Sequence, residues 1–398
     1  MGNVAVAQNG KTIYAKAIGK ADIETGKDAN TDSKYRIGSI SKTFTATLIF
    51  KAIEEKKLTL DQTIIAYFPN IKNANKITVG NLLNHRSGIF NLTNDPNFLK
   101  WNTYPKSRTE LINIISASQT VFEPNSKAEY SNSNYILLSI ILEKIYQKTY
   151  SEILNEKIIK PLQLKNTYYG AKINLANNEV NSYAFTGVWL KQPETDMSIP
   201  LGAGAIVSNP SDLNMFIAAL MNGKLLSAQS LAQMKTITDN YGMGVIKVPF
   251  NEHVGYGHGG AIDGFTSMLY YFPSNQLAVA ITSNGNNYEN NQILIALLSA
   301  YFNKDFQIPS FTEIALNTEE LDQYLGVYAA PNFPMKITIT KKENILIAQA
   351  TGQGPLELKA TAKNIFEFIA AGIVLEFNPT TKQMVLKQGG GKYLFTRE

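Results

Sequence analysis

The chain of 398 residues is 44% hydrophobic, which is ample for a sizeable core in one large domain or two. Its net charge of +5 is spread along the sequence without a basic run or interleaved basic and aromatic residues, and this pattern argues against nucleic acid as a partner. Because the sequence has no cysteine, disulfides, cysteine-ligated zinc and thiol catalysis are excluded.

A β-hairpin is predicted at the start of the chain. In residues 4–17 apolar residues alternate with small or polar ones on both sides of Asn9-Gly10, a dipeptide typical of a tight hairpin turn. A helix is expected from about Ser39 to Lys57, because apolar residues recur there three and four positions apart. Ser39 is therefore expected at or just inside the N-terminus of this helix.

The middle of the chain is predicted to be mostly helical. Residues 77–89 predict a short helix and a Ser-Gly turn, and residues 134–148 are apolar nearly all round, which predicts a buried helix. The segment 90–127 between them is long, polar and rich in asparagine. It is either a lid or pocket wall or, as is more common for such segments, a surface loop.

Strands are expected again after a further helix, which would be capped by Asn209 or Ser211. The strands and the last helix of this region are expected at residues 244–248, 264–271, 277–282 and 292–302. A strand, many helices, strands and a helix in this order predict an α+β domain with an antiparallel sheet made from both ends of the segment and flanked by helices. No apolar run approaches the roughly 18 residues of a membrane helix, so no membrane span is expected.

The composition of the chain changes after residue 302. Residues 306–320 are typical of a linker, and residues 321–398 contain seven or eight short strand-like segments separated by turn residues. This series predicts an antiparallel meander, and closing it into a small β-barrel would remove its exposed edges. We therefore expect a first domain over residues 1–305, a linker over residues 306–320 and a barrel domain over residues 321–398.

Ser39 and Lys42 form the one Ser-x-x-Lys pair of the sequence. Residues three apart lie side by side on a helix, so a neutral Lys42 amine would be able to accept the proton of the Ser39 hydroxyl. Burial near another cation would keep the amine neutral, and the helix N-terminus favours an anion at this point. Taken alone, however, such a pair is more often a helix cap beside a solvated lysine.

Two later segments carry side chains that would complement this pair. Tyr130 and Asn132 stand just before the buried helix and would project a phenol and an amide into the same cleft, although an asparagine-rich turn is the alternative. His258 lies in a glycine-rich segment, residues 256–261, which would let a substrate approach a strand backbone closely or would form a flexible hairpin. His253 is expected to be an exposed loop residue.

In this order, the Ser-x-x-Lys, Tyr-x-Asn and His-x-Gly segments resemble the serine β-lactamase and penicillin-binding protein superfamily. The resemblance is to its class C-like branch, peptidase family S12, which holds D-alanyl-D-alanine carboxypeptidases, D-aminopeptidases and related esterases. The flanking segments NLLNHRSGI, GAGAIVSNPSDL and GHGGAIDGF agree with it. The likeness covers about residues 4–302, and residues 321–328 are similar to the opening of the lipocalin-like domain that some of these hydrolases carry.

The resemblance implies a catalytic role for four residues. Ser39 would be the nucleophile that forms an acyl-enzyme, and Lys42 would take its proton. Tyr130 would pass a proton to the leaving group and later activate water. His258, where many relatives carry lysine, would support Tyr130 or the substrate, and His85 would hold a loop near the cleft.

Substrate binding is implied for the remaining matched positions. The backbone N–H groups of Ser39 and Ala261 would form the oxyanion hole. Asn132, Gly259 and Gly260 would contact the substrate. No metal and no cofactor is implied.

One departure from the family pattern bears on the substrate. In relatives that bind a penicillin or a C-terminal carboxylate, hydroxyl residues often follow the third-motif cation, whereas Gly259 and Ala261 offer none. A free carboxylate would lose one or two hydrogen bonds, each worth about 1.5–3 kcal/mol to a charged group. An ester, an amide or a D-amino-acid-containing peptide is therefore the expected substrate, unless Arg36 or Arg86 supplies the missing cation.

We therefore interpret the chain as a serine hydrolase that acts through an acyl-enzyme on a small-molecule or peptide substrate. The alternatives are a penicillin-binding or β-lactam-hydrolysing protein and a ligand-binding or sensory relative without turnover. The barrel would restrict access to the cleft, mediate oligomers or act as a passive cap, and the oligomeric state stays open. By family analogy the protein is expected to be periplasmic or secreted, with an export signal that the sequence does not include.

Overall fold

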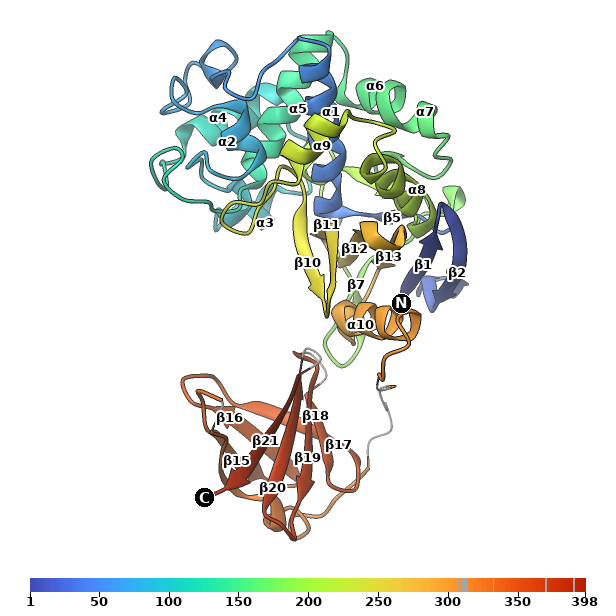
Figure 1. The fold of residues 1–398 in the computed structure, drawn as a ribbon, viewed down its shortest axis with the longest axis vertical. Helices are drawn as coiled ribbons and strands as arrows, with labels where there is room; N and C mark the ends of the chain where they lie inside the picture. The colour runs from blue at the N-terminus through green and yellow to red at the C-terminus, as the bar shows by residue number, and fades with distance from the viewer. Residues whose placement is uncertain (307, 309–313, 332, 369–370, 389–390) are drawn as a thin grey trace. The chain divides into compact units, whose positions relative to one another are not determined.

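Two compact units, residues 1–286 and 287–398, make up the chain in the computed structural model (Figure 1). The structure describes residues 1–398 except 307, 309–313, 332, 369–370 and 389–390. This division counts helix α10 (Asn290–Tyr301) with the second unit. The domain boundary expected at residue 305 and the linker expected at residues 306–320 remain predictions.

An antiparallel sheet of six strands forms one layer of the first unit (Figure 1). Its strands follow one another in the order β10 (Ile246–Phe250), β11 (His253–Ile262), β12 (Phe265–Phe272), β13 (Leu277–Ser283), β1 (Gly2–Gln8) and β2 (Lys11–Ile18). The predicted hairpin is confirmed as β1 and β2, and the φ angles of 52° at Asn9 and 75° at Gly10 are those of a tight hairpin turn. Because β1 pairs with β13, both ends of the unit contribute to one sheet, as predicted.

Strand β11 is an element that the sequence prediction missed. Its glycines lower the propensity for a strand, yet it pairs with β12 from Tyr256 to Ile262. A Cβ at Gly257 would lie 1.8 Å from the carbonyl oxygen of Leu269, so the close approach of the two strands requires glycine there. The expectation that His253 lies in an exposed loop was also wrong, since His253 opens this strand with its side chain 18% exposed.

Helices cover one face of this sheet and build a second, mainly helical region (Figure 1). The helices of the unit are α1 (Ser41–Glu54), α2 (Val79–Leu83), α3 (Phe98–Trp101), α4 (Arg108–Ala117), α5 (Asn132–Tyr146), α6 (Tyr150–Leu154), α7 (Lys160–Leu162), α8 (Pro210–Met221) and α9 (Ala228–Met234). Helix α8 packs against β1, β12 and β13, and its predicted cap is Asn209, whose side chain accepts the Asp212 N–H at 2.9 Å. In the described residues no helix has both the length and the apolar character needed to cross a membrane.

Short strands connect these layers. They pair as β3 (Lys20–Asp22) with β4 (Lys27–Asp28), β5 (Tyr35–Arg36) and β6 (Tyr168–Tyr169) with β9 (Ile206–Ser208), and β7 (Tyr183–Phe185) with β8 (Trp189–Lys191). The pairing of β5 with β9 fixes the chain directly before α1. It therefore helps to hold the start of that helix in place.

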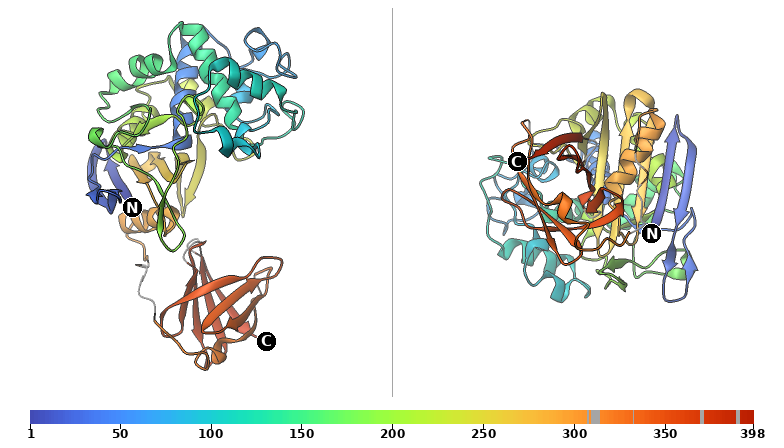
Figure 2. Two further views of the ribbon diagram at one scale, coloured as in Figure 1. Left: turned by 180° about the vertical axis from the view of Figure 1, so that it is seen from behind. Right: turned by 90° about the horizontal axis from the view of Figure 1, so that it is seen from below.

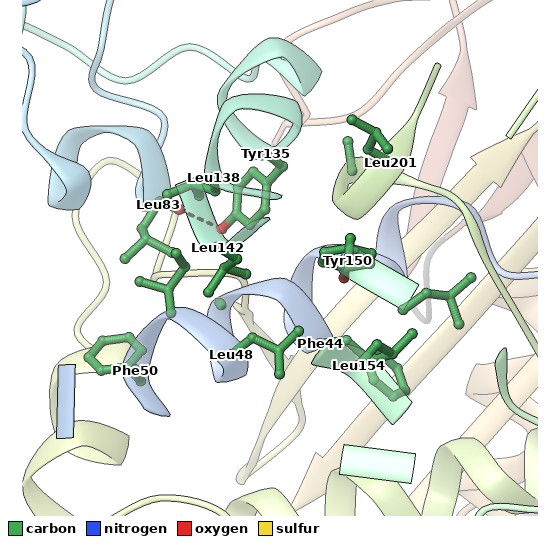
Figure 3. Packing of buried hydrophobic residues seen from close by; sticks show 14 of the residues in the cluster. Phe44, Leu48, Phe50, Leu83, Tyr135, Leu138, Leu142, Tyr150, Leu154 and Leu201 are labelled. Carbon is green, nitrogen blue, oxygen red and sulfur yellow. Dashed lines mark hydrogen bonds between the residues drawn. The ribbon is translucent and has the colours of Figure 1, made fainter. Parts of the chain in front are cut away.

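Helix α1 runs through the core of the unit, and its residues from Ser41 to Phe50 are all buried. The ring of Phe44 stacks on that of Phe216 in α8 with 3.6 Å between ring centroids. On another side, α1 contacts α5, where the hydroxyl of Tyr135 donates a hydrogen bond of 2.7 Å to the carbonyl oxygen of Leu83 (Figure 3). A helix packed on all sides holds its first turn in a fixed position, and the candidate site lies at that turn.

The second unit contains a closed antiparallel barrel of eight strands, as predicted (Figure 2). Its strands are β14 (Gly326–Ala329), β15 (Ile337–Lys342), β16 (Ile345–Ala350), β17 (Leu356–Ala362), β18 (Ile365–Phe368), β19 (Ile373–Asn378), β20 (Gln383–Gln388) and β21 (Gly391–Arg397). Pairing of β14 with β21 closes the barrel, and alternate side chains such as Ile337 and Ile339 fill its interior. The turn expected around residues 389–391 falls partly outside the described residues.

Candidate active site

Ser39 and Lys42 lie together where a 3-10 turn passes into α1. Ser39 belongs to the turn η1 (Gly38–Ile40), in which Gly38 has a φ angle of +49°, and Lys42 belongs to the first turn of the helix. The Nζ of Lys42 is 2.9 Å from the Oγ of Ser39. The hydroxyl and the amine are therefore neighbours, as the spacing of three residues predicts.

The amine of Lys42 is completely buried among uncharged partners. In addition to its contact with the Ser39 hydroxyl, it donates to the Oδ1 of Asn132 at 2.7 Å and to the carbonyl oxygen of Ala203 at 2.8 Å. Its Nζ also lies 4.9 Å from the centre of the Tyr130 ring. Burial lowers the pKa of Lys42 well below its usual value, because a low dielectric disfavours the ammonium form.

Tyr130 lies just before α5, and Asn132 is the first residue of this helix. The hydroxyl of Tyr130 is 2.7 Å from the Oγ of Ser39, so the Ser39 oxygen lies between the phenol and the amine. Burial raises the pKa of Tyr130 above its ordinary value, which keeps the phenol protonated. The Nδ2 of Asn132 donates to the hydroxyl of Thr93 at 3.1 Å, which orients its Oδ1 toward Lys42.

His85 holds the segment that carries Tyr130. Its Nδ1 accepts the N–H of Ser131 at 3.2 Å, and its carbonyl oxygen accepts the N–H of Glu129 at 2.9 Å. The imidazole packs against the Tyr130 ring with 4.5 Å between ring centroids, and burial lowers the pKa of His85 well below its usual value. A buried neutral imidazole that fixes a loop agrees with the structural role expected from the sequence.

Strand β11 lies directly against the turn that contains Ser39. A Cβ added at Gly260 would lie 2.1 Å from the carbonyl oxygen of Ile37, and one at Gly38 would lie 2.7 Å from the backbone nitrogen of Ala261. Glycine at these two positions therefore permits the backbones to approach one another. The structure thereby brings Ser39 and Ala261 to the same pocket.

His258 is buried on the same strand, close to the other side chains of the site. Its Nδ1 is hydrogen-bonded to the carbonyl oxygen of Gly259, so Nδ1 carries the proton of the neutral ring. The centroids of the His258 and Tyr130 rings are 6.3 Å apart. Burial lowers the pKa of His258 to about 4, so the ring is neutral near pH 7.

A pocket of about 820 Å³ opens beside Ser39. Asn132 and Ala261 line it together with Ser39, and its wall also includes residues of the segment from Phe98 to Tyr104. Of the two interpretations of residues 90–127, the pocket wall is therefore correct for this part. The segment is also more ordered than a loop, since it contains α3 and α4.

Arg36 and Arg86, which the sequence left as possible cations for a substrate carboxylate, are engaged elsewhere. Arg36 is buried and bonds to Asp263 and Glu194, each at 2.9 Å. Arg86 pairs with Asp239 and donates to the Oδ1 of Asn125 at 2.9 Å. Both guanidinium groups are therefore already neutralised by protein carboxylates.

Two parts of the site could not be found from residue types. The carbonyl oxygen of Ala203, in the 3-10 turn η6 (Leu201–Ala203), is a backbone group that any residue would offer, although the glycine-rich LGAGAI segment marks the turn. The hydroxyl of Thr93 lies in an asparagine-rich stretch without a motif. Within the described residues no cluster of three or more His, Asp or Glu side chains is placed to hold a metal ion.

The chain resembles known proteins over most of its length. A family model described as beta-lactamase matches residues 2–300. The chain is 25% identical over 294 residues to the teichoic acid D-alanine hydrolase of Staphylococcus aureus, an alignment that covers 72% of this chain and 71% of that protein.

Two solved structures extend the comparison. The D-stereospecific amidohydrolase from Streptomyces sp. is 28% identical with a TM-score of 0.63, over 71% of this chain and 89% of that one. The octameric penicillin-binding protein homologue from Pyrococcus abyssi is 22% identical with a TM-score of 0.70, over 99% of this chain and 96% of that one. At this identity the second likeness concerns the fold alone, and it includes the barrel.

Proposed function

The chain belongs to the beta-lactamase family and is a β-lactamase-like serine hydrolase, and on this premise we propose that it cleaves D-aminoacyl amides and esters through an acyl-enzyme on Ser39. One observation carries the proposal. The Ser39 hydroxyl contacts the Lys42 amine at 2.9 Å and the Tyr130 phenol at 2.7 Å. A hydroxyl that lies between a proton acceptor and a proton donor has the arrangement that acyl transfer requires.

The partners of Lys42 support its role as the base. A neutral amine has two N–H groups and one lone pair. The Oδ1 of Asn132 and the carbonyl oxygen of Ala203 are pure acceptors, so they take the two N–H groups. The lone pair is then left for the third neighbour, the Ser39 hydroxyl, whose proton it accepts.

Attack on the substrate follows from this proton transfer. The Ser39 Oγ forms a bond to the carbonyl carbon while its proton moves to the Nζ of Lys42. The negative charge that develops on the carbonyl oxygen would be stabilised by the N–H groups of Ser39 and Ala261. Each such donor is worth about 3–4 kcal/mol of barrier.

Collapse of the tetrahedral intermediate breaks the bond to the leaving nitrogen or oxygen. Tyr130 gives its proton to the leaving group and regains one from Lys42, so the proton that Ser39 lost is balanced. Water then attacks the ester carbonyl of the acyl-enzyme, and its proton returns to Ser39 along the same groups. His258 is neutral near pH 7 and packs beside Tyr130 without adding a charge there.

The choice of substrate rests on charge and on the relatives. Gly259 and Ala261 offer no hydroxyl, and Arg36 and Arg86 are already paired with carboxylates. A neutral amide or ester therefore fits the carbonyl end of the site better than a free carboxylate does. The D configuration is inferred from the named D-alanine hydrolase and D-stereospecific amidohydrolase.

A substrate panel tests the proposal. D- and L-aminoacyl amides, p-nitrophenyl esters and nitrocefin are compared for the wild type and for Ser39→Ala. We expect turnover of D-aminoacyl amides and esters that exceeds turnover of nitrocefin, and a loss of about 10³-fold or more in Ser39→Ala. Nitrocefin turnover far above ester turnover would instead assign the protein as a β-lactamase.

A fluorescent penicillin separates hydrolysis from simple binding. A stable adduct that disappears in Ser39→Ala would identify a penicillin-binding protein without turnover.

The periplasmic or secreted location expected from the family stays part of the proposal, and cell fractionation of the source organism tests it.

A further inference from the structure

The large pocket beside Ser39 is on the acyl side of the bond that is cleaved, an assignment that rests on the proposed function. The leaving group must stand next to the hydroxyl of Tyr130, because this phenol gives it a proton. Of the described residues, Tyr130 and His258 are not among those that line the pocket, which extends from Ser39 past Ala261 to Asp263. The acyl group, on the opposite side of the carbonyl carbon, therefore projects into the pocket.

Several polar residues of the pocket wall are hydrogen-bonded to one another. The hydroxyl of Thr195 donates to the Oδ1 of Asp263 at 2.6 Å and accepts from the Nδ2 of Asn102 at 2.9 Å. The Oδ2 of Asp263 bonds to Arg36, and the Nδ2 of Asn132 bonds to Thr93. These hydrogen bonds brace the wall and engage the hydroxyl proton of Thr195 and one N–H each of Asn102 and Asn132.

Apolar side chains form much of the remaining wall. Leu92, Ile136, Ile199 and Ile262 line the pocket from four different parts of the chain. At about 820 Å³ the pocket lies within the range of about 300–1,000 Å³ that holds a drug-sized ligand, far more than the methyl group of an alanyl residue needs.

Two large apolar side chains of the pocket wall are exposed to solvent. Leu99 on α3 is 80% exposed and Tyr104 is 63% exposed, and both line the pocket. The segment that bears them is fastened to the chain at Thr195 and Asp196, since the carbonyl oxygen of Asn102 accepts the N–H of Asp196 at 2.8 Å and its Nδ2 donates to the hydroxyl of Thr195 at 2.9 Å. Exposed apolar side chains on an anchored wall are positioned to be covered by a ligand.

We propose that this pocket selects acyl groups with a large apolar chain or ring, and that Leu99 and Tyr104 are specificity-determining residues. Each methylene of the acyl chain that leaves water would raise kcat/KM about three- to fourfold. Acetyl and alanyl groups would be poor substrates by comparison, because they leave most of the pocket unfilled.

A chain-length series tests the proposal on the full protein. We measure kcat/KM for p-nitrophenyl acetate, butyrate and hexanoate with the wild type, Leu99→Ala and the control Ile18→Ala, whose side chain is 66% exposed on the edge strand β2. We expect hexanoate to exceed acetate at least about tenfold. Leu99→Ala should lower the hexanoate value about fivefold through KM and leave acetate within about twofold, whereas Ile18→Ala should change neither.

The outcomes separate this inference from the function on which it rests. A flat chain-length series with activity that Ser39→Ala abolishes would overturn the inference and leave the hydrolase intact. Ester hydrolysis that survives in Ser39→Ala would overturn the proposed function as well. If no ester is turned over, the preference can be measured by calorimetry as the affinity for methyl-, butyl- and hexylboronic acid, which add to a reactive serine. Equal affinities for the three boronic acids would refute the inference.

Discussion

The Nζ of Lys42 donates a hydrogen bond of 2.8 Å to the carbonyl oxygen of Ala203, which joins the first turn of α1 to η6, 161 residues further along the chain. Together with the hydrogen bond to the Oδ1 of Asn132, this contact directs both N–H groups of the neutral amine to atoms that can only accept a hydrogen bond. The site thus orients Lys42 through uncharged partners. No ion pair is needed to hold it, so burial decides its protonation state.

The hydrolytic activity of the protein should therefore decrease as the pH falls. Burial lowers the pKa of Lys42, so the neutral base is present above this lowered pKa and is lost as the pH drops through it. We expect kcat/KM for an ester, measured from about pH 5 to 10, to rise to a plateau whose acid limb lies well below the usual range of lysine. Lys42→Met should lower the plateau about 10³-fold and remove the limb, and a limb at the ordinary lysine pKa would contradict the assignment.

Replacing Tyr130 should slow the turnover of a substrate to a degree that depends on its leaving group. Tyr130→Phe removes the hydroxyl 2.7 Å from Ser39 Oγ, so an amide, whose amine must be protonated, should lose about 10²- to 10⁴-fold in kcat. A p-nitrophenyl ester should lose less than about tenfold in kcat/KM, which reports the acylation step alone, because p-nitrophenolate leaves without a proton. The control is Tyr241→Phe, whose ring also packs against Tyr130 at 6.1 Å between centroids. Equal losses for the two substrates would exclude Tyr130 as the proton donor.

The side chains of the site could be predicted because each of them needs a particular chemical type at a recognisable spacing. Ser39 and Lys42 stand three residues apart at a helix start, and the structure joins them at 2.9 Å. The barrel was equally predictable, since each of its strands is a short segment in which apolar and polar residues alternate, and turn residues separate these segments. In both cases the signal lies within a few consecutive residues.

The parts that could not be predicted depend on contacts between distant segments. Ala203 contributes a backbone oxygen, which leaves no mark on the residue type. Strand β11 owes its position to glycines that allow close backbone approach, although glycine itself disfavours strands. Helix α3 is four residues long, too short for a periodic pattern, so its place in the pocket wall was one of two open interpretations.

Adding one methyl group at Gly260 should damage the site. A Cβ there would lie 2.1 Å from the carbonyl oxygen of Ile37, so β11 must move away from the turn that contains Ser39. The two proposed oxyanion donors, the N–H groups of Ser39 and Ala261, closely follow Ile37 and Gly260 in the chain. We therefore expect kcat/KM for an ester to fall about 10²-fold or more. Gly354→Ala is the matched control, since a Cβ there has no neighbour within 4 Å. Full activity of Gly260→Ala would rule out the close approach.

The stability of the fold should also depend on His258 at mildly acidic pH. In the folded protein burial lowers the pKa of this imidazole to about 4 from the ordinary 6.5. Below pH 6.5 the unfolded chain binds a proton that the folded protein does not bind until about pH 4, so the stability present at neutral pH is lost as the pH falls through this window. One such group accounts for on the order of 3 kcal/mol across the window, at about 1.4 kcal/mol per pH unit.

We therefore expect His258→Gln to lose less of its free energy of unfolding between about pH 7 and 5 than the wild type does, with parallel curves above pH 7. Urea unfolding at several pH values measures the difference. Some acid destabilisation should remain in the variant, because burial also lowers the pKa of His85. If the two proteins lost the same stability over this range, His258 would have to be protonated as readily in the folded state as in the unfolded chain, and the neutral ring assigned beside Tyr130 would be wrong.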